Sequence, residues 1–313
     1  MQKVLYILLL FYCTCSCTVR QGDGPTAPGY TWTKVLDSAA WSKSYNYQLV
    51  ALRDTLWVLH PEGNWYSTDA AVWVKSSLPN SIGNLAFLDY VLYNEALYGL
   101  GYFRGNIEQY IFKPEIYCSR DMRTWQLLSR TSNLPQRFFY HPFVFENKIW
   151  IIGGEDQDKQ YDDIWCSADA VTWVKQKSKA TPGKQSGSQV LQFKGKLYLL
   201  NNDVWTSADG IKWEKLTSEI LQDTRLSGYT AVVFDDKIWL LGCTRNQQFT
   251  SKTLYSEDGT NWKEADAPWS ARGGVAACVF KGKLYMTGGK YGGTSGSPEF
   301  VYSNDLWVME KSE

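Results

Sequence analysis

The stretch Ser256-Glu257-Asp258-Gly259-Thr260-Asn261-Trp262 decides the fold because it recurs along the chain. Four further copies keep the serine, an aspartate two residues later and a tryptophan six residues after the serine; they begin at Ser67, Ser119, Ser167 and Ser207. The tryptophans of successive copies lie 40 to 52 residues apart. A motif repeated at a period in the forties indicates that one supersecondary unit is stacked or arranged in a ring.

Each repeat has the pattern of four β-strands. An apolar strand that ends in an aromatic residue, such as Val232-Val-Phe234, is followed by a two-residue turn and a second apolar strand, such as Ile238-Trp-Leu-Leu241. Asn and Gly in these turns suit the positive φ angles of a tight hairpin. The second strand is apolar at nearly every position, which indicates burial on both faces. A third strand, the Ser-x-Asp turn and a fourth strand with the tryptophan complete the unit.

The number of repeats and the two ends of the chain predict a closed ring. Six tryptophans fall in fourth strands: Trp32, Trp73, Trp125, Trp173, Trp213 and Trp262. The pattern begins with a lone fourth strand near residues 30–35 and ends after a third strand near residues 305–309. We therefore predict an all-β fold, a six-bladed β-propeller of four-stranded blades over residues 30–313. The N-terminal strand would complete the last blade and remove the open sheet edge.

These motifs resemble the kelch-type β-propellers, including the central domain of galactose oxidase, and the likeness covers residues 30–313. It is carried by the Phe-x-x-x-(Ile/Leu)-(Trp/Tyr) hairpin, by the tryptophan of each fourth strand, and by Gly153-Gly154 and Gly288-Gly289 after two second strands. The glycine pair is absent from the other four repeats. The Ser-x-Asp turn is also partly similar to the Asp-box of sialidase propellers.

The N-terminal segment indicates export. Residues 1–17 contain an apolar run, Val4–Tyr12, that is too short to span a bilayer and fits a secretory signal. The small residues and cysteines that follow resemble a bacterial lipoprotein signal, which implies lipidation of Cys17 or, second, of Cys15; an ordinary cleaved signal peptide is the alternative. Residues 18–29 fit a flexible tether. We expect an exported protein at the outer membrane, the cell surface or the periplasm, held by a lipid anchor alone.

The composition excludes several classes of function. The 313 residues include 32 basic and 32 acidic ones, whereas nucleic-acid binders carry a basic excess, so no nucleic-acid partner is expected. With only two histidines, His60 and His141, and neither a metal-binding spacing nor a phosphate-binding glycine loop, the sequence predicts no metal and no other cofactor. Four cysteines after the leader are expected to be buried free thiols: Cys118, Cys166, Cys243 and Cys278.

One face of the predicted ring collects the long, variable loops. The loops between second and third strands and those between consecutive blades share this face, where binding residues usually lie. Trp41 and Trp269 fall in such loops and have no repeat position, so we expect them to offer rings for stacking on sugars. The loops at residues 102–115 and 290–300 add further aromatic side chains to this face.

Four cations stand at comparable positions in the loops between blades. Arg137 and Arg272 precede the aromatic end of the next strand by eight residues, and Lys184 and Arg225 precede it by nine. We expect them to converge at the mouth of the ring, where arginine would bind carboxylates. The alternative is that they pair with acids such as Asp223 or Asp266, or with loop carbonyls.

The sequence favours a binding module for a carbohydrate or an acidic small ligand. A sugar-acid enzyme, either an epimerase or mutarotase or a sialidase-like protein, is the alternative that the resemblance implies, with His141 and Glu155 as its catalytic candidates. The copper chemistry of galactose oxidase is not expected, because the two histidines come from different blades and no cysteine lies in a matching loop. A scaffold for a protein partner is the third alternative, because a propeller fold does not determine function.

Overall fold

The structure is a computed structural model. It describes residues 27–45, 47–60, 62–76, 89–106, 109–177, 181–293 and 298–312, except the side chains of residues 102–111. The predicted leader with Cys17 and most of the predicted tether lie outside the described residues, as do the side chains of most aromatic residues in the loop 102–115.

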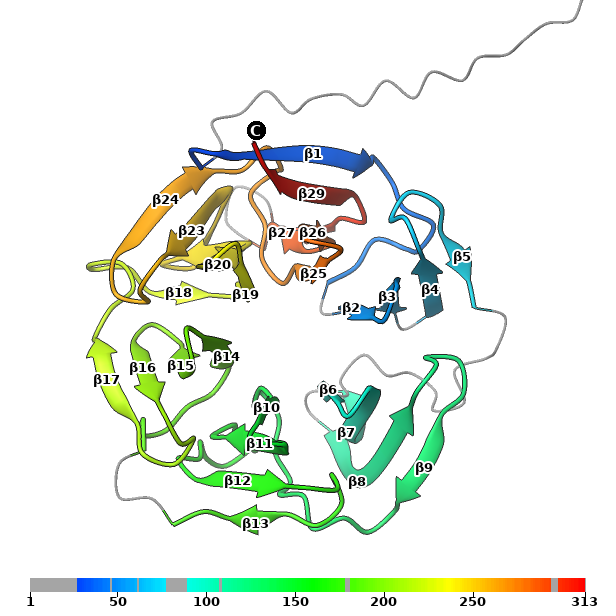
Figure 1. Ribbon diagram of the computed structural model, residues 1–313, viewed down its shortest axis with the longest axis vertical. Coiled ribbons are helices and arrows are strands. Elements are labelled where there is room, and N and C mark those ends of the chain that lie inside the picture. The colour runs from blue at the N-terminus through cyan, green and yellow to red at the C-terminus, as the bar shows by residue number, and fades with distance from the viewer. Residues whose placement is uncertain are drawn as a thin grey trace, which may run out of the picture.

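Six four-stranded antiparallel sheets follow one another around a ring in the described part of the chain (Figure 1). We number them in chain order. Sheet 1 contains β2 (Gln48–Leu52), β3 (Thr55–His60), β4 (Gly63–Ser67) and β5 (Val74–Lys75). Sheet 2 contains β6 (Asp89–Tyr93), β7 (Ala96–Asn106), β8 (Gln109–Ser119) and β9 (Gln126–Ser129). Sheet 3 contains β10 (Phe143–Phe145), β11 (Lys148–Ile152), β12 (Ile164–Ser167) and β13 (Val174–Lys175).

The second half of the chain continues the same plan. Sheet 4 contains β14 (Gln189–Phe193), β15 (Lys196–Leu200), β16 (Val204–Ser207) and β17 (Glu214–Thr217). Sheet 5 contains β19 (Thr230–Phe234), β20 (Lys237–Leu241), β23 (Lys252–Ser256) and β24 (Trp262–Asp266). Sheet 6 contains β25 (Ala276–Phe280), β26 (Lys283–Thr287), β29 (Leu306–Lys311) and β1 (Tyr30–Leu36). Two small sheets lie in loops: β18 (Leu226–Ser227) with β21 (Cys243–Arg245) and β22 (Gln248–Thr250), and β27 (Lys290–Tyr291) with β28 (Val301–Tyr302).

The first strand of the chain closes the ring, as predicted. β1 pairs antiparallel with β29, in a register that runs from Tyr30 opposite Lys311 to Leu36 opposite Leu306. It is the outermost strand of sheet 6, whose other three strands come from the C-terminal end of the chain (Figure 1). The pairing joins the two ends of the array, so the fold is an all-β propeller.

Apolar side chains fill the spaces between neighbouring sheets. The second strands are buried almost completely, as in β20, where the indole of Trp239 is 0% exposed. This burial explains why these strands are apolar on both faces. The four cysteines after the leader are free thiols, as predicted; Cys166 and Cys243 are buried, whereas Cys118 and Cys278 are only half-buried.

The Ser-x-Asp motif is a turn that carries its own hydrogen bonds. Asp258 Oδ1 accepts the backbone N–H groups of Thr260 and Asn261, each at 2.7 Å, and the Ser256 hydroxyl at 3.0 Å. Burial alone would raise the pKa of Asp258, but these hydrogen bonds lower it to about 2. Trp262 Nε1 donates back to Gly259 O at 3.2 Å. The repeated aspartate therefore serves the turn and is not a separate active site in each repeat.

Three tyrosines tie neighbouring sheets together at the starts of the innermost strands. The hydroxyl of Tyr47 lies 3.0 Å from Thr287 Oγ1 in sheet 6, and Tyr140 donates to Leu100 O in sheet 2 at 3.0 Å. Tyr229 donates to Asn201 O, just after β15 of sheet 4, at 2.7 Å. Each tyrosine thus links its own sheet to the preceding one, at the end of the ring where the long loops emerge.

Candidate functional site

The structure places two of the four predicted ligand-binding cations inside the protein. Arg137 is 4% exposed, and its Nη1 lies 2.5 Å from Asp163 Oδ1 and 2.7 Å from Gly153 O. Arg272 is 3% exposed and makes the equivalent bonds, at 2.5 Å to Asp305 Oδ1 and 3.2 Å to the carbonyl oxygen of Gly288. Both arginines therefore pair with an acid and a loop carbonyl, as in the alternative interpretation of the sequence, but the acids are Asp163 and Asp305 and not Asp223 or Asp266.

The buried arginines explain where the glycine pairs occur. Gly154 has φ +86°, and a Cβ there would lie 3.2 Å from Arg137 Cδ and 2.9 Å from Phe138 O. Gly289 has φ +100°, and its Cβ would lie 3.1 Å from Arg272 Cδ. Only glycine permits both the left-handed backbone and the close approach of the arginine stem. The glycine pair and the arginine eight residues before the aromatic strand end are thus one structural device.

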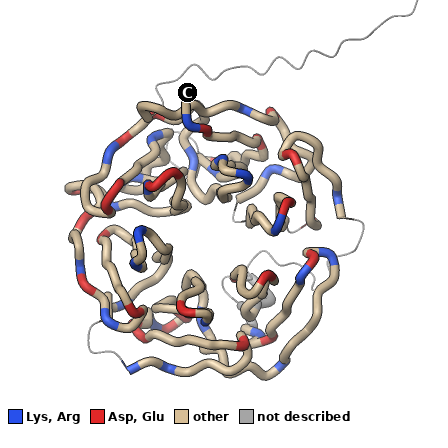
Figure 2. Tube along the Cα trace, in the orientation of Figure 1, with Lys and Arg blue, Asp and Glu red and all other residues tan. Residues whose placement is uncertain are grey.

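The other two predicted cations, Lys184 and Arg225, are exposed. They belong to the loops that lead into sheets 4 and 5, and they stand nine residues, not eight, before the aromatic strand end. Acidic and basic residues of the described chain are interspersed around the ring (Figure 2). The four cations consequently do not form one exposed cluster, because two of them are neutralised in the interior.

Trp41 and Trp269 lie in the core, in disagreement with their predicted stacking role. Trp41 is 2% exposed; its ring lies 4.8 Å from that of Trp73, and its Nε1 donates to Tyr47 Oη at 3.1 Å. Trp269 is 4% exposed and packs edge-on against Trp32 at a centroid distance of 4.5 Å. The loops fold back against the sheets so that these large rings are removed from water. Neither indole has a face open to a ligand.

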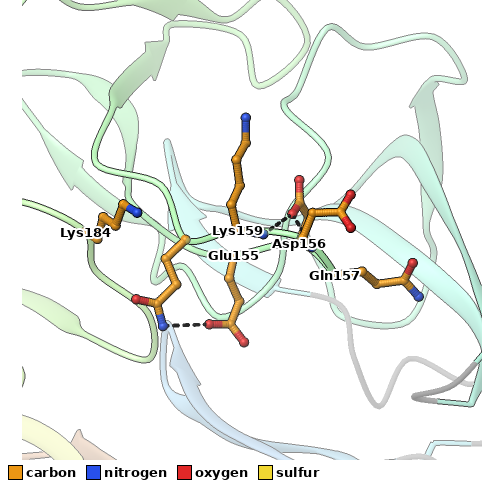
Figure 3. Close-up of a pocket in the computed structure, with 7 residues that line it drawn as sticks. Glu155, Asp156, Gln157, Lys159 and Lys184 are labelled. Atoms are coloured by element: carbon orange, nitrogen blue, oxygen red, sulfur yellow. Dashed lines mark hydrogen bonds between the residues drawn. The ribbon is translucent and has the colours of Figure 1, made fainter.

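A polar pocket of about 450 Å³ lies where two of the long loops meet (Figure 3). One loop joins β11 to β12 and the other joins β13 to β14. Figure 3 shows Lys184 at one end of the pocket and Gln157 at the other, with the Glu155 carboxylate accepting a hydrogen bond from Gln160 at 3.1 Å. The pocket is lined by Glu155, Asp156, Gln157, Asp158, Lys159, Gln160 and Lys184.

Internal hydrogen bonds hold the first loop in shape. Asp156 Oδ1 accepts the backbone N–H groups of Asp158 at 2.9 Å and Lys159 at 2.8 Å, and its other oxygen accepts the hydroxyl of Tyr161. The ring of Tyr161 lies over the buried guanidinium of Arg137, with 4.0 Å between the guanidinium carbon and the ring centroid. Arg137 therefore supports the pocket from below and does not line it.

Backbone hydrogen bonds join three loops around this pocket. Phe138 and Glu155 exchange two N–H···O bonds of 2.9 Å, and Gly154 N donates to Gln185 O at 2.6 Å. Gly187 N donates to Phe139 O at 2.8 Å. The loops before sheet 3, within sheet 3 and before sheet 4 thus form one connected surface, as expected for loops that lie on the same face of the ring.

Phe139 is a candidate that the sequence analysis missed. Its side chain is 58% exposed, and its backbone has φ +57°, which is uncommon for an aromatic residue. Its neighbours in the chain, Phe138 and Tyr140, make the contacts that fix its position. The signal in the sequence was the aromatic run Phe138-Phe139-Tyr140 directly after Arg137, at a place where the repeat has no strand.

The two catalytic candidates from the sequence lie at different places. Glu155 lines the polar pocket, whereas His141 precedes β10, one of the innermost strands. Solvent reaches His141, yet enough protein surrounds it that burial lowers its pKa to about 4. Within the described residues no hydrogen bond joins His141 to Glu155.

Two further features bear on possible activities. Among the described residues, no group of three or more His, Cys, Asp or Glu side chains is placed to hold a metal ion. Nor does this part of the chain contain a helix long and apolar enough to cross a membrane.

The fold defines the chain as a β-propeller, and a solved structure agrees. The structure of YjhT superposes with a TM-score of 0.68 over 88% of this chain and 96% of that chain. The two sequences are 13% identical, so the likeness concerns the fold alone. No protein-family model and no curated protein sequence matches this chain.

Proposed function

We propose that this protein is a carbohydrate-binding module that works at the pocket beside Phe139. The observation that carries the proposal is the exposed aromatic ring of Phe139, held in a left-handed backbone conformation, in a loop whose preceding residue, Phe138, is hydrogen-bonded to Glu155 of the polar pocket. Sugars present an apolar C–H face that packs on aromatic rings and a rim of hydroxyl groups that needs hydrogen-bonding partners. Ligand pockets typically combine such an apolar surface with a few fixed polar groups.

The polar groups of the pocket suit hydroxyl groups. Glu155 offers a carboxylate whose one hydrogen-bond partner in the pocket is Gln160, and Lys184 adds a donor from the facing loop. Asp156 is already committed to Tyr161 and to the backbone of its own loop, so it fixes the shape of the pocket. The backbone bonds between the loops keep these groups in place before a ligand arrives, which reduces the ordering cost of binding.

A neutral sugar fits this pocket better than an acidic one. Three carboxylates line it, at Glu155, Asp156 and Asp158, against the two ammonium groups of Lys159 and Lys184. The cation cluster expected from the sequence would have favoured uronates or sialates, but two of its arginines are neutralised in the interior. The acidic ligand remains as an outcome of the test below.

The location of this binding module is proposed from the N-terminal sequence. The apolar run and the cysteines of residues 1–17 support export and lipidation at Cys17, and the hairpin and glycine motifs support a kelch-type propeller. A tethered propeller at the envelope would present its loop face to external polysaccharide.

The test is a glycan array probed with the wild-type protein and two variants. Phe139→Ala removes the proposed stacking ring, and Phe300→Ala is the matched control because its ring is also exposed, at 46%, but lies in the loop between β26 and β29, just before β28. We expect Phe139→Ala to weaken binding about tenfold, since covering one exposed ring contributes about 1.4 kcal/mol. Phe300→Ala should retain the wild-type pattern.

Other outcomes of the same array are informative. Hits confined to uronates or sialates would favour an acidic ligand and would justify a search for an altered sugar by NMR. Wild-type affinity of Phe139→Ala for every hit would show that the pocket is not the site. The absence of any hit would favour a protein partner.

A further inference from the structure

Sheets 3 and 6, which share the buried arginine and the glycine pair, lie on opposite sides of the ring (Figure 1). In sheet 3, Phe138 follows the arginine and exchanges two N–H···O bonds of 2.9 Å with Glu155, the residue after the glycine pair. In sheet 6, Gly273 follows the second buried arginine and exchanges two bonds of the same length with Lys290, again the residue after the glycine pair. Lys290 therefore occupies the position in sheet 6 that Glu155 occupies in sheet 3.

These two equivalent positions carry opposite charges. Glu155 brings a carboxylate to the polar pocket, whereas Lys290 brings an ammonium group to the long loop between β26 and β29. Both side chains are half-buried. The nearby Arg272 is paired with Asp305, but no ion pair joins Lys290 to a carboxylate of the described residues. The positive charge of Lys290 is thus left for a ligand.

Aromatic rings surround the ammonium group of Lys290. Its Nζ lies 4.1 Å from the centroid of the Tyr45 ring and 4.4 Å from that of Phe300. Tyr302 stacks on Tyr45, with 5.6 Å between the ring centroids and an interplanar angle of 23°. Ring faces attract a cation but do not neutralise its charge. A molecule that reaches the ammonium group therefore also meets these rings, and we call the four residues the Lys290 cluster.

Backbone hydrogen bonds fix the Lys290 cluster in place. Lys290 stands opposite Tyr302 in the pairing of β27 with β28. Gly289 N donates to Ser44 O at 3.1 Å, and Ser303 N donates to Gly289 O at 3.0 Å. These bonds tie the loop that carries Tyr45 to the loop that carries the other three side chains. A cluster ordered in advance reduces the cost of binding.

We propose that the Lys290 cluster is a second binding site, which takes a carboxylate attached to an apolar group, such as an aromatic acid. The ammonium group donates charged hydrogen bonds to the carboxylate, and the apolar group packs on the rings, of which Phe300 is 46% exposed. A sugar acid fits less well, because the ring faces beside Lys290 leave its hydroxyl groups without partners. The site shares no residue with the polar pocket, so it does not depend on the proposed function.

The test is a titration of the wild-type protein, followed by ligand-observed NMR, with 3-phenylpropionate, its neutral amide and sodium glucuronate. We expect saturable binding of 3-phenylpropionate. The amide should bind about tenfold more weakly, because it cannot form a hydrogen bond between charged groups. Glucuronate, which has the carboxylate but no apolar group, should also bind about tenfold more weakly. Failure of 3-phenylpropionate to bind, or equal affinity for the acid and either of the other probes, would overturn the proposal.

Two substitutions of Lys290 locate the site. Lys290→Met keeps the length of the side chain without its charge and should weaken binding of 3-phenylpropionate about tenfold, whereas Lys290→Arg should restore it. Lys196→Met is the matched control, because Lys196 is an exposed lysine at the start of β15, beside a short turn on the opposite face of the ring. Wild-type affinity in Lys290→Met, or an equal loss in Lys196→Met, would show that the acid binds elsewhere.

Phe300→Ala separates this site from the polar pocket. It should weaken binding of 3-phenylpropionate about threefold, since one ring of the cluster is lost, while the glycan pattern stays that of the wild type. Loss of neutral-glycan hits in Lys290→Met would place sugar binding at the Lys290 cluster and would overturn the division between the two sites.

Discussion

Replacing Asp89 with asparagine should make the folded protein less sensitive to alkaline pH. The carboxyl lies at the ring centre with a pKa raised to about 8 by burial, whereas an unfolded aspartate has a pKa of about 4. Between these values the folded state keeps a proton that the unfolded state has lost. The unfolded state therefore binds fewer protons, and the free energy of unfolding falls as the pH rises.

The size of the effect follows from one proton. The linkage slope is about 1.4 kcal/mol per pH unit, so wild-type stability should drop by roughly 3 kcal/mol from pH 5 to pH 7 through this group alone. Asparagine offers a similar shape and does not titrate. The difference in free energy of unfolding between Asp89→Asn and the wild type should therefore grow by about 1.4 kcal/mol per unit in favour of the variant.

Urea unfolding followed by tryptophan fluorescence can measure this difference at pH 5, 6 and 7, since the chain has 15 tryptophans. Asp162→Asn, at an exposed aspartate, controls for the chemical change itself. Because both proteins share every other titrating group, their background pH dependence cancels. A wild-type-to-variant difference that stays constant within about 0.5 kcal/mol over this range would refute the protonated state of Asp89.

Two further predictions concern residues that the sequence assigned to a ligand and the structure assigns to the interior. Arg137→Met should lower the free energy of unfolding by about 3 kcal/mol at pH 7, because it removes the buried partner of the partly buried Asp163 and leaves only Lys175 and Trp165 bonded to it. Burial would raise the pKa of Asp163, but the bonds from Arg137, Trp165 and Lys175 lower it to about 2, so wild-type stability should fall from pH 4 to pH 2. The stability of Arg137→Met should fall less over this range, because only the bonds from Trp165 and Lys175 remain. Trp41→Ala should cost about 3–5 kcal/mol and leave glycan affinity of the folded protein unchanged; weaker affinity would revive its stacking role.

The fold could be predicted from the sequence because the same pattern of strands and turns recurs from repeat to repeat. The spacing from Ser256 to Trp262 recurs, and in each copy the aspartate accepts the backbone N–H groups of the residues two and three positions later. The lone strand at Tyr30 and the missing one after Met309 could only be reconciled by pairing the two ends. Where the strand pattern of one repeat is ambiguous, the other repeats show which strand is present, so the architecture does not depend on any single repeat.

The candidate site could not be predicted in the same way, since its residues occur once. Arg137 stands eight residues before the aromatic end of the next strand and lies under a glycine pair, whereas Lys184 stands nine residues before it and reaches the surface. The sequence differs at this point by a single residue of spacing. The burial of Trp41 depends on how a loop folds back, which has no local sequence signal. Phe139 is exposed because the residues on either side of it are fixed by other loops. These placements depend on tertiary contacts between sheets.

The same contacts suggest that, in this propeller, buried residues hold the long loops in place while exposed loop residues are left free for a ligand. In sheets 3 and 6 the arginine, its aspartate and the glycine pair form a buried base from which a long loop emerges. At sheet 3 the next layer outward consists of Tyr161 over Arg137, and beyond it the polar pocket. The positive charge of the buried Arg137 is paired with Asp163, so Arg137 orders the loop but does not attract an anionic ligand. Under the proposed function, ligand selection falls to the exposed groups of the loop, which the repeat does not constrain and which can differ without loss of the ring.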